Sequence, residues 1–359
     1  MEFFFYDDKF FVAIELARFI PPFWVILAIM TPFLNAMVNV IDVYFAGGVY
    51  ENEWDGAAIS CLYKIVAVPA VFFWLWKEEA DQNLFQQILV IESELIFLAF
   101  LAGILYSLSS LFYFRAIMTE EKSDVVFVES IFNLTAVVVP ILSVFLLGKF
   151  INLFQWFGIF LAVFGAFVLI VWGQDFSGFT FRDNRLVSMG LAVVSLSLAM
   201  IIEDKVYATA SFAPVFAIFS LGCFSAGCVF ALVRVYKKME NLFIYVKRFW
   251  PVFVAMETLE LSAVFFHEKT ISLTDSHNLS TIYCSQPIFA LLISYFLLLF
   301  PFFWNRGLSD WARYHLAWFE KAKFFCELTE KVGEDQRGYV PAKIIGTIAI
   351  VLAVLLISF

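Results

Sequence analysis

The chain has 359 residues, of which 62% are hydrophobic and only 15% are charged. A soluble domain of this length carries roughly a quarter of its residues as charges and cannot bury so much apolar surface in one core, so lipid must be the solvent for most of the chain. The net charge of -9 gives no indication of nucleic-acid binding, because the acidic residues are spread over short loops and no basic stripe is present.

The chain begins with a segment, residues 1–21, that lacks the basic start and small-residue cleavage site of a signal peptide. We expect this segment to lie at the membrane interface. About ten apolar runs follow, each long enough to cross a bilayer and without the alternation of barrel strands. Backbone groups must be satisfied internally in hydrocarbon, so each run is predicted to be a helix. The runs lie near 22–45, 57–76, 94–117, 125–147, 152–173, 186–206, 213–236, 249–267, 279–303 and 340–359.

The predicted fold is therefore an all-α integral membrane bundle, and its second half echoes its first. The stretch AMVNVIDVY at 36–44 is similar to AMIIEDKVY at 199–207, and Pro140 corresponds to Pro287. We expect two five-helix repeats, 22–173 and 186–359. Because an odd number of spans turns the second repeat over, the repeats would be inverted, which is the construction of transporters with alternating access.

The apolar sequence is interrupted by Gly148 and Lys149, between the fourth and fifth runs. We expect a tight turn at the membrane surface here, with the Lys149 side chain reaching the lipid headgroups.

Polar side chains inside the apolar runs are candidate binding residues, because amide and ionisable groups are costly in hydrocarbon. The candidates for binding substrate or a proton are Asn35, Asn39, Lys64, Asn133, Glu257, Glu260, Tyr283 and Gln286. The two amides of the first run can instead bond a neighbouring helix as packing contacts. Lys64 can instead extend to the surface or pair locally.

The pair Glu257 and Glu260 lies three residues apart near the middle of the eighth run. A central acidic residue costs about 2.5–3.5 kcal/mol on insertion, whereas each Val, Leu or Phe returns only about 0.3–0.6 kcal/mol. The span therefore needs protonated carboxyls or partners in the bundle. One Glu would then bind a cationic part of a substrate or carry a coupling proton; alternatively, one of them is held by Lys64 or a neighbouring hydroxyl as fixed structure.

Metal, cofactor and catalytic chemistry find no support in the sequence. The cysteines are scattered, and His267, His277 and His315 are far apart, so no metal-site spacing is present. No nucleophile–base pair or phosphate-binding glycine loop occurs either. We therefore expect neither a cofactor nor a metal, and we do not expect an enzyme.

An insertion at about 304–339 is predicted to form an amphipathic helix that lies on the membrane, either as a peripheral lid or as a gate.

The segment 115–170 resembles the EamA family of the drug/metabolite transporter superfamily. The matching positions are Ala116, Pro140, Leu147-Gly148, Gln155, Gly158 and Gly165, whereas Lys149 replaces the usual Glu. The resemblance implies a central cavity surrounded by spans one, three, four, six, eight and nine, which favours Tyr283 and Gln286 as contacts. It also implies that both termini are cytoplasmic, whereas the Lys and Arg residues of the loops favour the opposite orientation.

The function predicted from these features is that of a secondary transporter in the cytoplasmic membrane. It would move a small organic metabolite by alternating access, with proton coupling as one option, and its partners would be that metabolite and membrane lipids, not nucleic acid. Two alternatives remain open. A nucleotide-sugar or lipid-linked sugar carrier would need a strongly basic cavity, and a non-transporting scaffold or sensor would keep the fold without the coupling.

Overall fold

The computed structural model describes residues 23–46, 50–78, 84–118, 132, 134–171, 184–236, 242–286, 288–290, 292–293, 345–346, 348–353 and 356. These residues form helices and turns without strands, which confirms the predicted all-α class. The N-terminal segment 1–21, the insertion at 304–339 and the candidate Asn133 lie outside the described residues.

The helices follow the apolar runs closely. The first half contains α2 (Phe23–Ala46), α3 (Glu53–Tyr63), the 3-10 turn η1 (Lys64–Val66), α4 (Ala67–Glu78), α5 (Leu84–Val90), α6 (Ser93–Met118), α8 (Thr135–Leu147) and α9 (Leu153–Val171). The second half contains α10 (Asn184–Tyr207), α11 (Phe212–Tyr236), α12 (Leu242–Ile271), α13 (Ser276–Ile282) and the 3-10 turn η3 (Tyr283–Ser285). A last helical stretch includes residues 348–353.

Five helical stretches of the described chain are long and apolar enough to cross a membrane: Phe23–Asp42, Glu53–Phe73, Ser93–Met118, Val187–Tyr207 and Phe212–Tyr236. Helices α8 and α9 are apolar as well, and α9 carries exposed phenylalanines along its length, among them Phe157, Phe160 and Phe164. Side chains of this kind on the outside of the bundle suit contact with lipid tails.

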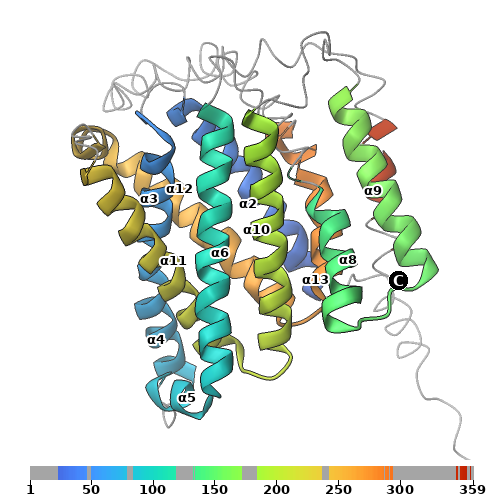
Figure 1. Cartoon of the computed structure of the whole chain (residues 1–359), viewed down its shortest axis with the longest axis horizontal. Coiled ribbons are helices and arrows are strands. Elements are labelled where there is room, and N and C mark those ends of the chain that lie inside the picture. Colours follow the sequence, from blue (N-terminus) through green and yellow to red (C-terminus); the bar gives the residue numbers. More distant parts are fainter. Residues whose placement is uncertain are drawn as a thin grey trace, which may run out of the picture.

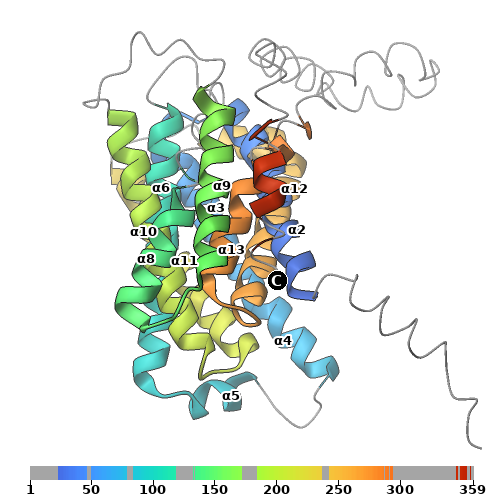
Figure 2. The same cartoon turned by 90° about the vertical axis from the view of Figure 1, so that its right-hand side faces the viewer.

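The long helices lie side by side, with successive helices running in opposite directions (Figures 1 and 2). Helix α6 packs against α10 and α11, and α12 packs against α2. Helix α11 also contacts α3, while α8 contacts α10 and α13. Helices from the two halves of the chain are therefore interleaved and do not form two separate bodies.

The contact between α6 and α11 depends on two glycines. A Cβ atom on Gly103 would lie 2.1 Å from the carbonyl oxygen of Phe219, and one on Gly222 would lie 2.2 Å from that of Phe100. No side chain fits at either position, so glycine is what lets the two backbones touch, as small residues do in membrane helices generally.

The expected turn at Gly148 and Lys149 is present between α8 and α9. Gly148 adopts φ 65°, a left-handed conformation that ends α8, and the Lys149 amide donates to the Ser143 carbonyl at 3.2 Å. The expected direction of the Lys149 side chain was wrong. Its ammonium lies 2.7 Å from Asp204 Oδ1 and also pairs with Asp275, so it joins the turn to α10 and to the start of α13. Nearby carboxylates compete with lipid headgroups for the ammonium, and here they bind it.

Burial and these two carboxylates act on Lys149 in opposite directions. Burial alone would lower the pKa of Lys149, but the hydrogen bonds to Asp204 and Asp275 outweigh it, and the pKa is raised. The contribution of the lysine charge is therefore fully present below the ordinary lysine pKa and is lost as the pH rises through the raised pKa of Lys149.

Candidate functional site

A polar cavity of about 70 Å³ lies inside the bundle, between α2, α3, α6, α12 and the turn η3. Since a water molecule needs roughly 10–15 Å³ on this measure, the cavity has room for several waters or a small polar group. Five of the predicted residues line it: Asn35, Asn39, Glu260, Tyr283 and Gln286. A concave site with a few convergent polar groups is the usual form of a small-molecule site.

Helix α2 supplies one wall of this cavity through Asn35, Asn39 and Asp42. These residues are spaced by four and three positions, so they share one face of the helix, as their spacing in the sequence predicts. Asp42 is only 5% exposed, and its Oδ1 atom accepts no hydrogen bond within the described structure. Tyr283, in η3, and Gln286, the residue that follows η3, also line the cavity.

Lys64 and Glu260 form a buried ion pair beside the cavity. The ammonium of Lys64 lies 2.7 Å from Glu260 Oε1, which also accepts a 2.7 Å hydrogen bond from the Ser60 hydroxyl. Lys64 is 1% exposed, so it does not extend to the surface. It stands at the point where α3 passes into η1, and a 3-10 stretch within a long helix often marks a functional hinge.

Glu257 lies in a different environment from Glu260, although sequence reasoning treated the two as a pair. It is 1% exposed, and neither of its carboxyl oxygens has a hydrogen-bond partner within the described structure. Asp42, Glu257 and Glu260 interact electrostatically with one another and with Lys64. Several carboxyls thus share a single ammonium group.

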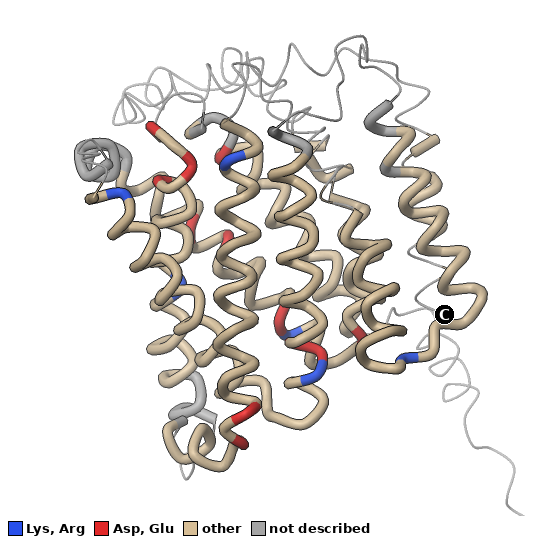
Figure 3. The backbone as a smooth tube through the Cα atoms, in the orientation of Figure 1, with Lys and Arg blue, Asp and Glu red and all other residues tan. Residues whose placement is uncertain are grey.

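The distribution of charge along the bundle sets these groups apart. Most Lys, Arg, Asp and Glu residues of the described chain lie near the ends of the helices, and only a few lie along their middle (Figure 3). One further buried pair, Arg234 with Asp55, joins the end of α11 to the start of α3. Charges inside the membrane are expensive, so those beside the cavity must be compensated or functional.

Sequence reasoning missed two sets of residues. Ser60 and Tyr106 line the cavity, but they come from helices in which nothing in the sequence distinguished them. The histidines are far apart in the sequence and His267 was set aside as a ligand for that reason, but the fold brings it against Glu203, 64 residues away. His267 also bonds Tyr283 at 2.5 Å, which links this buried group to the cavity. In the sequence, the signals for this buried group were the acid Glu203 within the run that forms α10 and the adjacent His267 and Glu268 in α12.

The comparisons with known proteins agree with this architecture. Residues 22–171 match the model of the EamA-like transporter family. No curated protein matches the chain. A crystal structure, described only as that of a protein, aligns with 90% of this chain and 95% of its own at 12% identity and a TM-score of 0.53. That likeness concerns the fold alone, and it extends over both halves of the chain.

The apolar spans and the family match together identify the chain as a multi-pass membrane protein whose residues 22–171 are similar to the EamA-like transporter family.

Proposed function

We propose that this protein is a secondary transporter that moves a small organic metabolite across the cytoplasmic membrane by alternating access. The substrate site would be the cavity between α2, α6, α12 and η3, and the carboxyls beside it would carry the coupling proton or bind a cationic part of the substrate. The observation that carries the proposal is the group Asp42, Glu257 and Glu260 around the single ammonium of Lys64, next to a polar cavity.

Charge balance supports this role. An isolated ionised carboxylate in hydrocarbon is so costly that it is neutralised by a proton or a cation. Glu260 has Lys64 as its counter-charge, whereas Asp42 and Glu257 have oxygens that no hydrogen bond satisfies. Neutralisation of these two therefore calls for a proton or a cation, and a group that must exchange one is suited to coupling transport to an ion gradient.

The packing of the helices supports inverted five-helix repeats at 22–173 and 186–359. If α2 corresponds to α10 and α6 to α12, the contact of α6 with α10 has its counterpart in the contact of α12 with α2. Corresponding helices also run in opposite directions, as inversion requires (Figure 1). Two such halves can exchange their conformations, which is the physical basis of alternating access.

The cavity also helps to choose between substrates. Its described lining includes the acids Asp42 and Glu260 but neither Lys nor Arg. An anionic nucleotide sugar would meet repulsion there, so a neutral or cationic metabolite is the better fit. The scaffold alternative predicts that no substrate moves at all.

The test is uptake into proteoliposomes, with and without an imposed pH gradient, over a panel of neutral, cationic and anionic metabolites. We expect flux of a neutral or cationic compound. The variants D42N and E257Q should fold but lose the response of the flux to the pH gradient, because an amide cannot carry the proton. The variant E94Q is a matched control, since Glu94 is an exposed acid.

Two results would contradict the proposal. Absence of flux for every member of the panel would favour the scaffold. Folded D42N, E257Q and E260Q variants that keep both the rate and the pH dependence of the wild type would make these carboxyls structural.

A further inference from the structure

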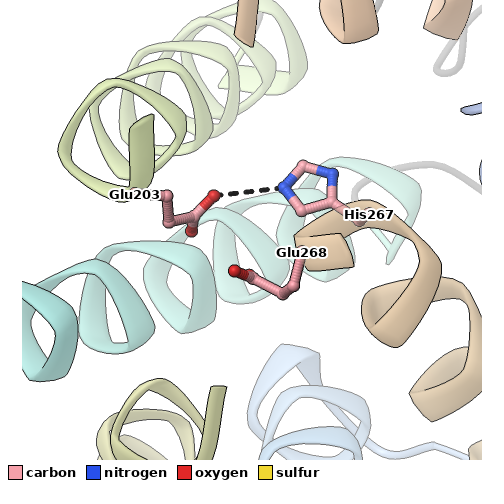
Figure 4. A group of neighbouring side chains, drawn as sticks. All are labelled: Glu203, His267 and Glu268. Atoms are coloured by element: carbon pink, nitrogen blue, oxygen red, sulfur yellow. Dashed lines mark hydrogen bonds and ion pairs between the residues drawn. The ribbon is translucent and has the colours of Figure 1, made fainter. Parts of the chain in front are cut away.

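A second buried polar group lies between α10 and α12, near the end of both helices. Glu203 comes from α10, whereas His267 and Glu268 are neighbours in α12, and the three side chains point toward one another (Figure 4). All three are at most 2% exposed. One ligating atom from each lies within 4.8 Å of the others.

The distances within this cluster suit a shared ion. His267 Nε2 lies 3.2 Å from Glu203 Oε2, which is long for a charge-assisted hydrogen bond. Two ligands held at about 2.1 Å from one metal ion, at an angle of about 100°, lie roughly 3.2 Å apart. The three ligating atoms lie within 4.8 Å of one another, so the Glu268 carboxyl would move closer to complete a set of three ligands.

The surrounding hydrogen bonds orient the ligands as those of metal sites do. The other ring nitrogen of His267, Nδ1, bonds the Tyr283 hydroxyl at 2.5 Å. If Nδ1 carries the proton, the lone pair of Nε2 faces the carboxylates. The Tyr207 hydroxyl donates to Glu268 Oε2 at 2.8 Å, which leaves Oε1 available. Outer hydrogen bonds of this kind fix the tautomer and the direction of metal ligands.

Among the residues that the structure describes, the cluster has unused acceptors and forms no ion pair with a Lys or Arg side chain. Glu203 Oε1 and Glu268 Oε1 are buried and have no hydrogen-bond partner within the described structure. Lys149 pairs with Asp204, the residue that follows Glu203, and with Asp275. Two carboxyls and an imidazole lone pair without a compensating charge form a site for a cation.

We propose that Glu203, His267 and Glu268 bind a single divalent transition-metal ion of the Zn²⁺ type. One nitrogen and two carboxylate oxygens make a mixed set that suits first-row divalent ions and leaves an open position, unlike the all-oxygen sites preferred by Mg²⁺ and Ca²⁺. Tyr283 belongs both to this site and to the wall of the cavity, so an ion here would fix one side of the cavity. The inference does not rest on the proposed transport function, because it concerns binding alone.

The test uses Co²⁺ as a spectroscopic substitute for Zn²⁺, added to the purified full chain in detergent after any affinity tag has been removed. We expect one equivalent of Co²⁺ to bind, to give visible d–d absorption bands and to be displaced by Zn²⁺. The variants E203Q and H267Q should abolish the bands. Y283F should weaken binding about 10–100-fold, because it removes only the orienting hydrogen bond.

Two controls separate this site from other groups in the bundle. H277Q removes another buried histidine, and E94Q removes an exposed acid of α6, so both should leave the bands and the affinity unchanged. Failure of the wild-type protein to bind a stoichiometric equivalent would overturn the proposal and leave protons as the neutralising species. Equal binding by wild type, E203Q and H267Q would also overturn it, since the ion would then lie elsewhere. Because the first outcome is measured on the wild-type protein, the proposal is tested even where a variant fails to fold.

Discussion

The buried pair of Lys64 and Glu260 allows a quantitative test of how charge is balanced within the bundle. The variant K64M removes the ammonium but keeps an unbranched apolar side chain of similar length. Glu260 then retains only the Ser60 hydroxyl, while Asp42 and Glu257 remain its electrostatic neighbours. The change therefore isolates the charge and leaves the packing nearly intact.

The size of the effect follows from the burial of the two partners. Lys64 is 1% exposed and Glu260 is 13% exposed. Removing one partner of a buried pair costs about 3–5 kcal/mol, whereas replacing both by apolar residues is often neutral or stabilising. We expect K64M to lose about 3–5 kcal/mol of unfolding free energy and the double variant K64M/E260M to recover most of that loss.

The assay is unfolding by SDS in mixed micelles, with size-exclusion chromatography to confirm that each variant begins folded. The variant K205M is the matched control, because Lys205 pairs with Glu94 at 3.3 Å where both side chains are more than half exposed. K205M should lose less than about 1 kcal/mol of unfolding free energy. A double variant that loses as much as the sum of its two single variants would refute the reasoning, because the two charges would then be independent.

Three further predictions concern the glycines and Lys149, and the same unfolding assay tests them. G148A should lower the free energy of unfolding by only about 1 kcal/mol, because a Cβ atom there meets nothing within 4 Å and only the left-handed backbone conformation is penalised. A much larger loss would mean that Gly148 also has a packing role. G103A should lower the free energy of unfolding by more than G148A does, by about 1–3 kcal/mol or more, because its Cβ atom would meet backbone atoms that cannot move aside. Equal losses for the two variants would contradict the close contact of α6 with α11. K149A should lower the free energy of unfolding by about 1–3 kcal/mol, and this loss should be nearly constant between about pH 6 and 9 because the pKa of Lys149 is raised. K149E should lose more, because an acid would then lie beside Asp204 and Asp275. A K149E variant more stable than K149A would show that the ion pairs are unimportant.

The positions of the helices could be predicted from sequence because lipid imposes both a length and an apolar composition on each span. The predicted runs 94–117 and 213–236 differ from α6 (Ser93–Met118) and α11 (Phe212–Tyr236) by a single residue at most. The common face of Asn35 and Asn39 on α2 also follows from the sequence, because helical periodicity depends on local sequence alone.

The partners of the polar side chains could not be predicted in the same way. Lys64 and Glu260 are 196 residues apart, and their contact depends on how α3 and α12 are rotated about their own axes. Lys149 was expected to reach the headgroups because nothing in its own segment identified Asp204 and Asp275 as partners. His267 was set aside for the same reason, since its neighbour Glu203 belongs to another helix.

The glycine contact between α6 and α11 has a mechanical consequence. At Gly103 and Gly222 the surfaces that meet are bare backbone, while the rings of Tyr106 and Phe219 pack against each other about one turn away. Separating the helices would open a void on both sides, whereas a small rotation about the backbone contact would cost less dispersion energy than separation. The contact joins one helix from each half of the chain, so it is a point about which the crossing angle of α6 and α11 can change slightly while the two backbones stay in contact.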